Sequence, residues 1–294
     1  MLTRQKVVLA LLDGASQPVT RTVLVKLMFL LRRETDLWQD TPFYDFVPHK
    51  FGPFSFLLYR ELTGLEACGF VSPGSDHVCL EPRTAVLRAQ EIADLDDSVR
   101  AAVGLVLKRY GRTPQKELLR DVYTRYPWYA SRSELTDLVP NTVPAPFAAE
   151  LAVYTVGYEG KSVDSFFGDL LRRGIKGLLD VRANPVSRKY GFAKRTLADI
   201  AGKLGLTYDH FPELGISGEE RRDLDDRASY MRLLDHYEAE MLPKQTPCLM
   251  ELVGHLKARP SALVCMEKDV TCCHRSRLAK AAAVATGLHI RHLA

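Results

Sequence analysis

The second half of the chain alternates short apolar segments with longer amphipathic ones, and this alternation restricts the fold more than any other feature. The apolar segments have the length of buried strands, and the amphipathic ones have helical spacing. Strands that alternate with helices form a mostly parallel sheet covered by helices on both faces. We therefore predict an α/β domain of this kind. Its predicted strands are residues 152–157, 177–182, 207–211, 262–266 and 289–293, and its predicted helices are residues 162–173, 195–204, 230–242, 247–256 and 272–286.

The first half is richer in helical patterns. Apolar residues of the segment TRTVLVKLMFLLRRE recur at helical spacing, and an aromatic-rich segment, FYDFVPHKFGPFS, has an extended pattern. A short hairpin over residues 70–80 turns at PGSD. Helices followed by a hairpin are typical of a winged helix, which binds DNA, although small helical domains also dock proteins. We predict a mainly α, winged-helix-like domain. Its predicted helices are residues 2–12, 20–34, 55–67, 97–110 and 113–124.

Residues 135–150, LTDLVPNTVPAPFAAE, separate the two halves. Three prolines and an asparagine in this segment disfavour a continuous helix or strand. A chain of 294 residues is also long for a single core. We predict a recognition or partner domain over residues 1–146 and the α/β domain over residues 147–294.

Composition restricts the class of protein. No apolar run approaches the roughly 20 residues that span a bilayer, so we expect no membrane partner. The six cysteines lack the spacing of a secreted disulfide scaffold, and the apolar stretch at the amino terminus is interrupted by Asp13. These features indicate free thiols and a cytoplasmic location. A net charge of +4 permits a polyanionic partner.

Polar segments follow four of the predicted strands. Because the carboxyl ends of parallel strands meet at one edge, these segments are expected to converge there. The segment GYEGKS lacks the full spacing of a phosphate loop. The segment after the second strand is strongly basic and includes aromatics, a combination that suits phosphates and stacked bases. Its relevant residues are Arg182, Arg188, Lys189, Tyr190, Phe192, Lys194 and Arg195.

The segment CMEKDVTCCHR follows the fourth strand. We place Cys273 in the first turn of a helix, where free amides favour a thiolate. His274 and Arg275 add positive potential, and Glu267 is a candidate general acid or base. A phosphatase-type loop is disfavoured, since no cysteine is followed by arginine at the required spacing. No C-x-x-C pair is present and adjacent residues rarely face one ion, so we predict no metal and no cofactor, zinc being disfavoured.

The sequence also allows other interpretations of the segment CMEKDVTCCHR. A disulfide between Cys265 and Cys273 would be a redox device in the cytoplasm. Cys265 and Cys272 also suit a buried apolar position, and Cys273 is either functional or structural.

The second half resembles a known family. The segments YTVGYEG, LDVRANPVSRKYGFAK, YDHFPELG and LVCMEKDVTCCHRSRLA are similar to the domain of unknown function 488 (DUF488) family, over residues 152–293. The resemblance implies an α/β domain but no reaction. The positions that it implies are shared are Tyr158, Asp180, Arg182, Pro185, Ser187, Arg188, Phe192, Lys194, His210, Cys265, Glu267, Cys273, His274 and Arg275.

The first half resembles another family. The segments LVKLMFLLRRE and FGPFSFLLYRELTGLEACGFV are similar to the Panacea or SocA-like antitoxin domain, over residues 5–130. This resemblance implies partner binding or regulation in phage defence or a toxin–antitoxin setting.

Three hypotheses of function follow. The first is an enzyme that acts on a nucleotide or DNA in bacterial genome defence or repair. The second is a non-catalytic sensor that binds the same ligands, and the third is an antitoxin-like regulator that binds a protein. We assign catalysis to Cys273, Glu267 and His274. We assign ligand binding to Tyr158, Asp180, Arg182, Ser187, Arg188, Phe192, Lys194, His210 and Arg275.

Overall fold

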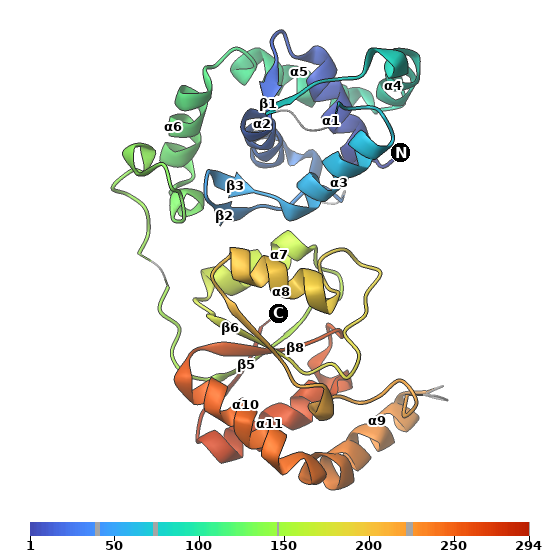
Figure 1. Ribbon diagram of the computed structural model, residues 1–294, viewed down its shortest axis with the longest axis vertical. Helices are drawn as coiled ribbons and strands as arrows, with labels where there is room; N and C mark the ends of the chain where they lie inside the picture. Colours follow the sequence, from blue (N-terminus) through green and yellow to red (C-terminus); the bar gives the residue numbers. More distant parts are fainter. Residues whose placement is uncertain (39–41, 73–75, 146, 222–225, 294) are drawn as a thin grey trace. The chain divides into compact units, whose positions relative to one another are not determined.

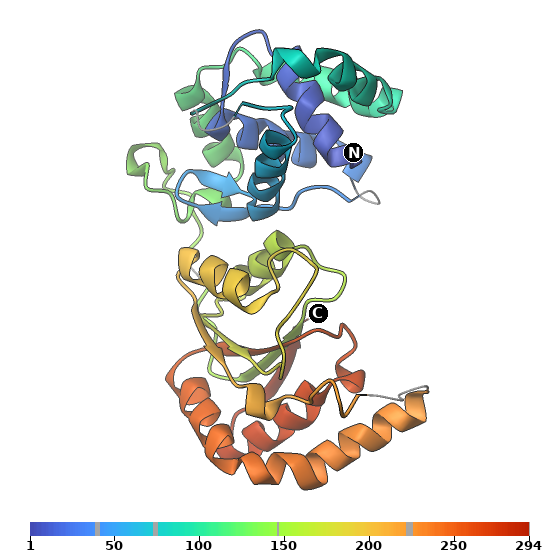
Figure 2. The same ribbon diagram turned by 45° about the vertical axis from the view of Figure 1, so that its right-hand side comes forward.

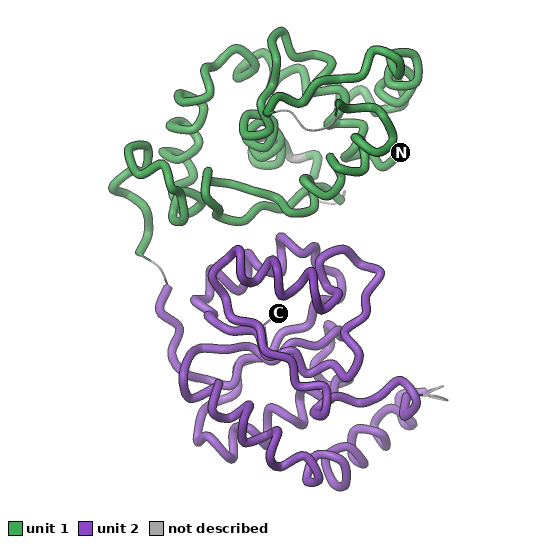
Figure 3. The backbone as a smooth tube through the Cα atoms, viewed as in Figure 1, with its two compact units in different colours: residues 1–145 green, residues 146–294 purple. Residues whose placement is uncertain are grey.

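The computed structural model describes residues 1–38, 42–72, 76–145, 147–221 and 226–293. The chain forms two compact units, Met1–Ala145 and Pro146–Ala294 (Figure 3). No helix among the described residues combines the length and apolar composition needed to cross a membrane.

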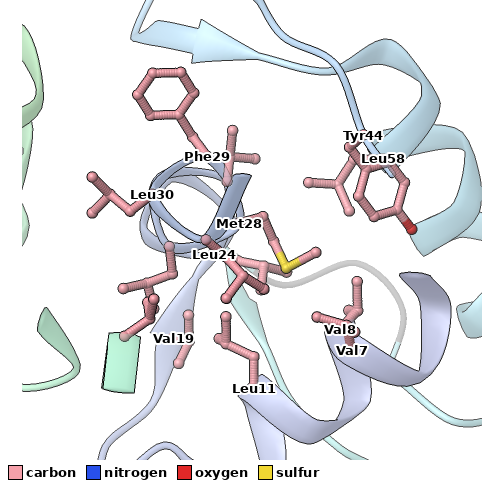
Figure 4. Packing of buried hydrophobic residues seen from close by; sticks show 14 of the residues in the cluster. Val7, Val8, Leu11, Val19, Leu24, Met28, Phe29, Leu30, Tyr44 and Leu58 are labelled. Atoms are coloured by element: carbon pink, nitrogen blue, oxygen red, sulfur yellow. The ribbon is translucent and has the colours of Figure 1, made fainter. Parts of the chain in front are cut away.

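The first unit is built around α2 (Arg21–Glu34). The side chains from Leu24 to Leu31 are all buried. Figure 4 shows four of them, Leu24, Met28, Phe29 and Leu30, among apolar residues from neighbouring elements. The Thr20 hydroxyl caps this helix by accepting a hydrogen bond from the Val23 amide at 3.1 Å. The other helices are α1 (Thr3–Gly14), α3 (Phe56–Ala67), α4 (Ala85–Ala93), α5 (Asp97–Tyr110) and α6 (Gln115–Arg125).

Short antiparallel strands accompany these helices. Strand β1 (Val19–Thr20) pairs with β4 (His77–Val78), and β2 (Val47–His49) pairs with β3 (Gly52–Phe54). The base of the predicted hairpin is present as a bridge between Val71 and Leu80, while residues 73–75 of its turn lie outside the described residues. The winged-helix assignment stays a prediction. Helix α4 was not predicted. None of its residues is fully buried, and its apolar residues Val86 and Leu87 are exposed, while Ile92 packs against the core of the unit.

The second unit confirms the predicted α/β architecture. Its five parallel strands have the order β7-β6-β8-β5-β9. Helices α7 and α8 lie on one face, and α10 and α11 lie on the other (Figures 1 and 2). The strands are β5 (Val153–Gly157), β6 (Gly177–Asp180), β7 (Thr207–His210), β8 (Ser261–Cys265) and β9 (Ile290–Leu293). The helices are α7 (Val163–Arg172), α8 (Lys194–Lys203), α9 (Arg227–His236), α10 (Thr246–Ala258) and α11 (His274–Thr286).

The strand order creates a switch point between β6 and β8. These neighbouring strands are hydrogen-bonded to each other, but the chain leaves them in opposite directions. From β6 it continues through α8 to β7, and from β8 it continues through α11 to β9. In open α/β sheets, ligands bind where the connections diverge in this way, beyond the carboxyl ends of the strands.

Candidate functional site

Four side chains from the end of β8 and the segment after it come together at this switch point, and we call them the donor cluster: Cys265, Glu267, Cys273 and His274. Glu267 Oε2 accepts hydrogen bonds from the thiols of Cys265 and Cys273, each at 3.0 Å. His274 Nδ1 lies 3.7 Å from Cys265 Sγ and 4.0 Å from Cys273 Sγ. The donor atoms of the two cysteines and the histidine all lie within 4.8 Å of one another.

The local fold brings these side chains together. Cys265 is the last residue of β8, and a 3₁₀ turn (Val270–Cys272) returns the chain to the same place. Cys273 is the N-cap residue of α11 and His274 is its first residue. Cys273 therefore lies one step before the predicted first turn, at the helix amino terminus where the exposed amides favour negative charge.

His274 is oriented by a backbone carbonyl. Its Nε2 lies 3.0 Å from the carbonyl oxygen of Val181, just beyond β6. A carbonyl only accepts, so Nε2 carries the proton and Nδ1 presents its lone pair to the thiols. The imidazole is 1% exposed. This contact joins the carboxyl ends of β6 and β8 across the switch point.

The second carboxylate oxygen of Glu267, Oε1, also accepts hydrogen bonds. Arg221 Nη1 donates to Glu267 Oε1 at 3.2 Å, and the Tyr230 hydroxyl donates to the same oxygen at 3.4 Å. Burial raises the pKa of Glu267, but the thiol hydrogen bonds, a backbone amide and Arg221 outweigh burial and bring the pKa to about 2. The side chain is 20% exposed. An ionised carboxylate therefore reaches solvent beside two thiols.

The two thiols differ in their tendency to ionise. The hydrogen bond from Cys273 lowers the pKa of Cys265, with His274 acting in the same direction, while burial raises the pKa of Cys273. All six cysteines are free thiols in the structure.

The segment that carries Glu267 is tightly fixed. Arg275 Nη1 donates to the Glu267 carbonyl at 2.6 Å, and the amide of Tyr158 donates to the Met266 carbonyl at 3.1 Å. Gly157 lets β5 approach closely, since a Cβ there would lie 1.9 Å from the Glu267 carbonyl oxygen. Arg275 is 2% exposed and bonds to backbone carbonyls. Arg275 therefore stabilises the backbone of this segment, and its predicted contact with a ligand stays a prediction.

Four further residues predicted to bind a ligand also lie in the interior: Tyr158, Asp180, Arg182 and Phe192. Asp180 is fully buried and pairs with Arg182, whose Nε donates to Asp180 Oδ1 at 2.8 Å. Arg182 is 6% exposed and also donates to the Phe192 carbonyl at 2.8 Å. The ring of Phe192 is fully buried and stacks on Tyr158 at 4.2 Å between centroids. Because it is buried and paired, Arg182 has no exposed charge for a phosphate. Phe192 likewise has no exposed ring face for a base. These residues stabilise the carboxyl end of β6 from the interior of the unit.

The remaining basic residues of the β6 segment are exposed. Arg188 and Lys189 lie on the surface, and the Ser187 hydroxyl accepts a hydrogen bond from the Lys189 amide at 3.1 Å. Lys194 is exposed and donates to His210 Nδ1 at 2.9 Å. His210 Nε2 in turn lies 2.9 Å from the Arg182 carbonyl. These groups place positive charge at the carboxyl ends of β6 and β7.

Two contributors were missed by sequence reasoning. Arg221 and Tyr230 lie more than 35 residues before Glu267, and nothing in the sequence pairs them with it. Adjacent residues rarely face one ion, and a metal site was disfavoured on that ground. Cys273, the N-cap residue of α11, and His274, its first residue, nevertheless both have donor atoms close to Cys265 Sγ.

Comparison with known proteins gives one match. Residues 162–282 match the family model described as "Domain of unknown function DUF488". No curated protein matches the chain, and no solved structure matches it. The match supports the resemblance of the second half to this family, while the resemblance of the first half to the Panacea or SocA-like domain stays a prediction.

Proposed function

We propose that the second unit is an enzyme that acts on a nucleotide, either free or within a nucleic-acid strand. The observation that carries this proposal is the position of the donor cluster at the switch point, beside the exposed cations of the β6 segment. A reactive group and a phosphate-binding surface are the two parts that such an enzyme requires.

The two parts have different roles. Arg188, Lys189 and Lys194 hold phosphate oxygens, because exposed guanidinium and ammonium groups form charge-assisted hydrogen bonds with them. Glu267 is the group assigned to proton transfer, since it is ionised and is the most exposed member of the donor cluster. His274 and the two thiols fix its position.

The burial of the thiols favours a second candidate function. Cys265 is 1% exposed and Cys273 is fully buried, which suits a cluster that stabilises a binding surface and performs no reaction. The second candidate is a non-catalytic nucleotide or nucleic-acid sensor. For the first unit, recognition of DNA or of a protein partner stays a prediction from sequence alone.

Binding tests the phosphate surface directly. We expect Arg188→Ala to weaken binding of the full chain to its phosphate ligand and to reduce the slope of log affinity against log salt by about one for a nucleic-acid strand. The measurement is fluorescence anisotropy with labelled single-stranded DNA, double-stranded DNA, RNA and a free nucleotide, over a series of salt concentrations.

The matched control is Lys203→Ala. Lys203 is an exposed cation on the same helix as Lys194, but it lies at the end of α8 that leads to the amino end of β7. The control should bind like the wild-type chain. Equal losses in both variants, or no binding to any probe at low salt, would contradict the proposal.

A further inference from the structure

We propose that Cys265, Cys273 and His274 bind one thiophilic divalent cation, zinc in the first place, and that the fourth position of its tetrahedral shell stays open beside Glu267 Oε2. The inference deepens the proposed function because it concerns the same residues. It rests on that function only for what the cation would contribute to turnover, since metal binding requires no substrate.

The separations between donor atoms fit such an ion. With bonds of about 2.3 Å to sulfur and about 2.0 Å to nitrogen, tetrahedral angles place the two donors about 3.5 Å apart. His274 Nδ1 lies 3.7 and 4.0 Å from the two sulfurs. Glu267 Oε2 lies 3.0 Å from each sulfur, so this carboxylate borders the fourth position and stays available for proton transfer.

The chemistry of the donors points to a soft or borderline cation. Two thiols, an imidazole nitrogen and a carboxylate oxygen present lone pairs toward one another in a largely buried place. When the thiols ionise, a carboxylate 3.0 Å away repels them unless a cation lies between. Thiolate and imidazole ligands together favour zinc over magnesium or calcium, which prefer oxygen.

The surroundings of the cluster are those of a metal site. A metal-ligating histidine commonly donates its second ring nitrogen to a carbonyl, and His274 Nε2 meets the Val181 carbonyl at 3.0 Å. Arg221 and Tyr230 donate to the second oxygen of Glu267 and so hold the carboxylate beside the fourth position. The ligands are therefore oriented before an ion arrives.

Metal content after reconstitution tests the inference. The full chain is treated with chelator and reductant, incubated with zinc or cobalt, and freed of excess metal. We expect about one equivalent of zinc per chain, and for cobalt a thiolate-to-metal charge-transfer band with the visible bands of a tetrahedral ion. Cys265→Ser and Cys273→Ser should lose most of the bound zinc and the larger part of the charge-transfer intensity.

Cys272→Ser is the matched control. Cys272 neighbours Cys273, but its thiol lies 3.7 Å from Asp269 Oδ2 and outside the donor cluster. This variant should bind zinc and cobalt like the wild-type chain. Circular dichroism of each variant establishes that it is folded, and the cobalt spectrum of the wild-type chain stands even if a variant does not fold.

Three outcomes would overturn the inference. They are no bound metal in the reduced wild-type chain, a cobalt spectrum without thiolate charge transfer, and equal metal content in Cys265→Ser and Cys272→Ser. The proposed function fails separately. If metal is absent but Arg188 still governs ligand binding, only the metal inference falls; if metal binds but no nucleotide or strand does, only the proposed function falls.

Discussion

Glu267→Gln is expected to lower turnover of the nucleotide or nucleic-acid substrate by about 10²- to 10⁴-fold, the range typical of a lost proton-transfer group. Glutamine keeps the shape of the side chain but removes the negative charge of the carboxylate, whose Oε2 accepts hydrogen bonds from two thiols, each at 3.0 Å. Binding through the exposed cations should persist, so the loss should fall on turnover at saturating substrate. The measurement is mass-spectrometric product analysis of the full chain with the probes that bind.

Glu213→Gln is the control for this prediction. Glu213 also follows a strand of the sheet at its carboxyl end, and it too accepts from a thiol, that of Cys248 at 3.7 Å. Glu213 lies outside the donor cluster, so turnover by the Glu213→Gln variant should match turnover by the wild-type chain. Binding without any product in the wild-type chain, or equal turnover in Glu267→Gln and Glu213→Gln, would favour the non-catalytic sensor.

Asp180→Asn is expected to destabilise the second unit by about 3–5 kcal/mol, the usual cost of removing one partner of a buried ion pair. Asp180 is fully buried, and its Oδ1 and Oδ2 accept from Arg182 at 2.8 and 2.5 Å. The Tyr208 hydroxyl also donates to Oδ2 at 2.7 Å. Asparagine keeps the volume but leaves the Arg182 guanidinium without a counter-charge in the interior.

Chemical denaturation followed by circular dichroism measures this effect. Trp38 and Trp128 are the two tryptophans of the chain and both belong to the first unit, so tryptophan fluorescence follows that unit as an internal reference. Asp199→Asn is the comparison variant, because Asp199 forms an exposed pair with Lys203 and such pairs contribute about 0–1 kcal/mol. If both variants unfold at the same denaturant concentration, the structural role given to the Asp180–Arg182 pair is wrong.

The inner strands of the sheet in the second unit could be predicted from sequence because they are buried on both faces. Residues of β5 and β8 are buried throughout, so each reads as a continuous apolar segment followed by polar residues. The order of the strands in the sheet could not be predicted in this way. Nothing in the local pattern states that β8 lies between β6 and β5, which is what brings Val181 to His274.

The side chains at the edge were harder to assign. The sequence shows that Arg182 follows a strand, but not that the chain turns its guanidinium inward to Asp180, two residues earlier. Phe192 likewise turns inward against Tyr158. Arg188, Lys189, Lys194 and Arg195 keep the exposure that phosphate binding requires. Residue type and position therefore located the carboxyl-end edge of the sheet, while side-chain direction depended on buried partners such as Asp180 and Tyr158.

Photo-crosslinking tests most directly the claim that a nucleotide occupies the carboxyl ends of β6 and β8. The full chain would be irradiated with a 5-bromodeoxyuridine oligonucleotide and with an azido-nucleotide, and crosslinked peptides identified by mass spectrometry. If a nucleotide lies there, crosslinks are expected within residues 182–195 and 265–275, and fewer of them are expected in Arg188→Ala. Crosslinks confined to the first unit or to other surfaces of the second, and unchanged in Arg188→Ala, would contradict this claim.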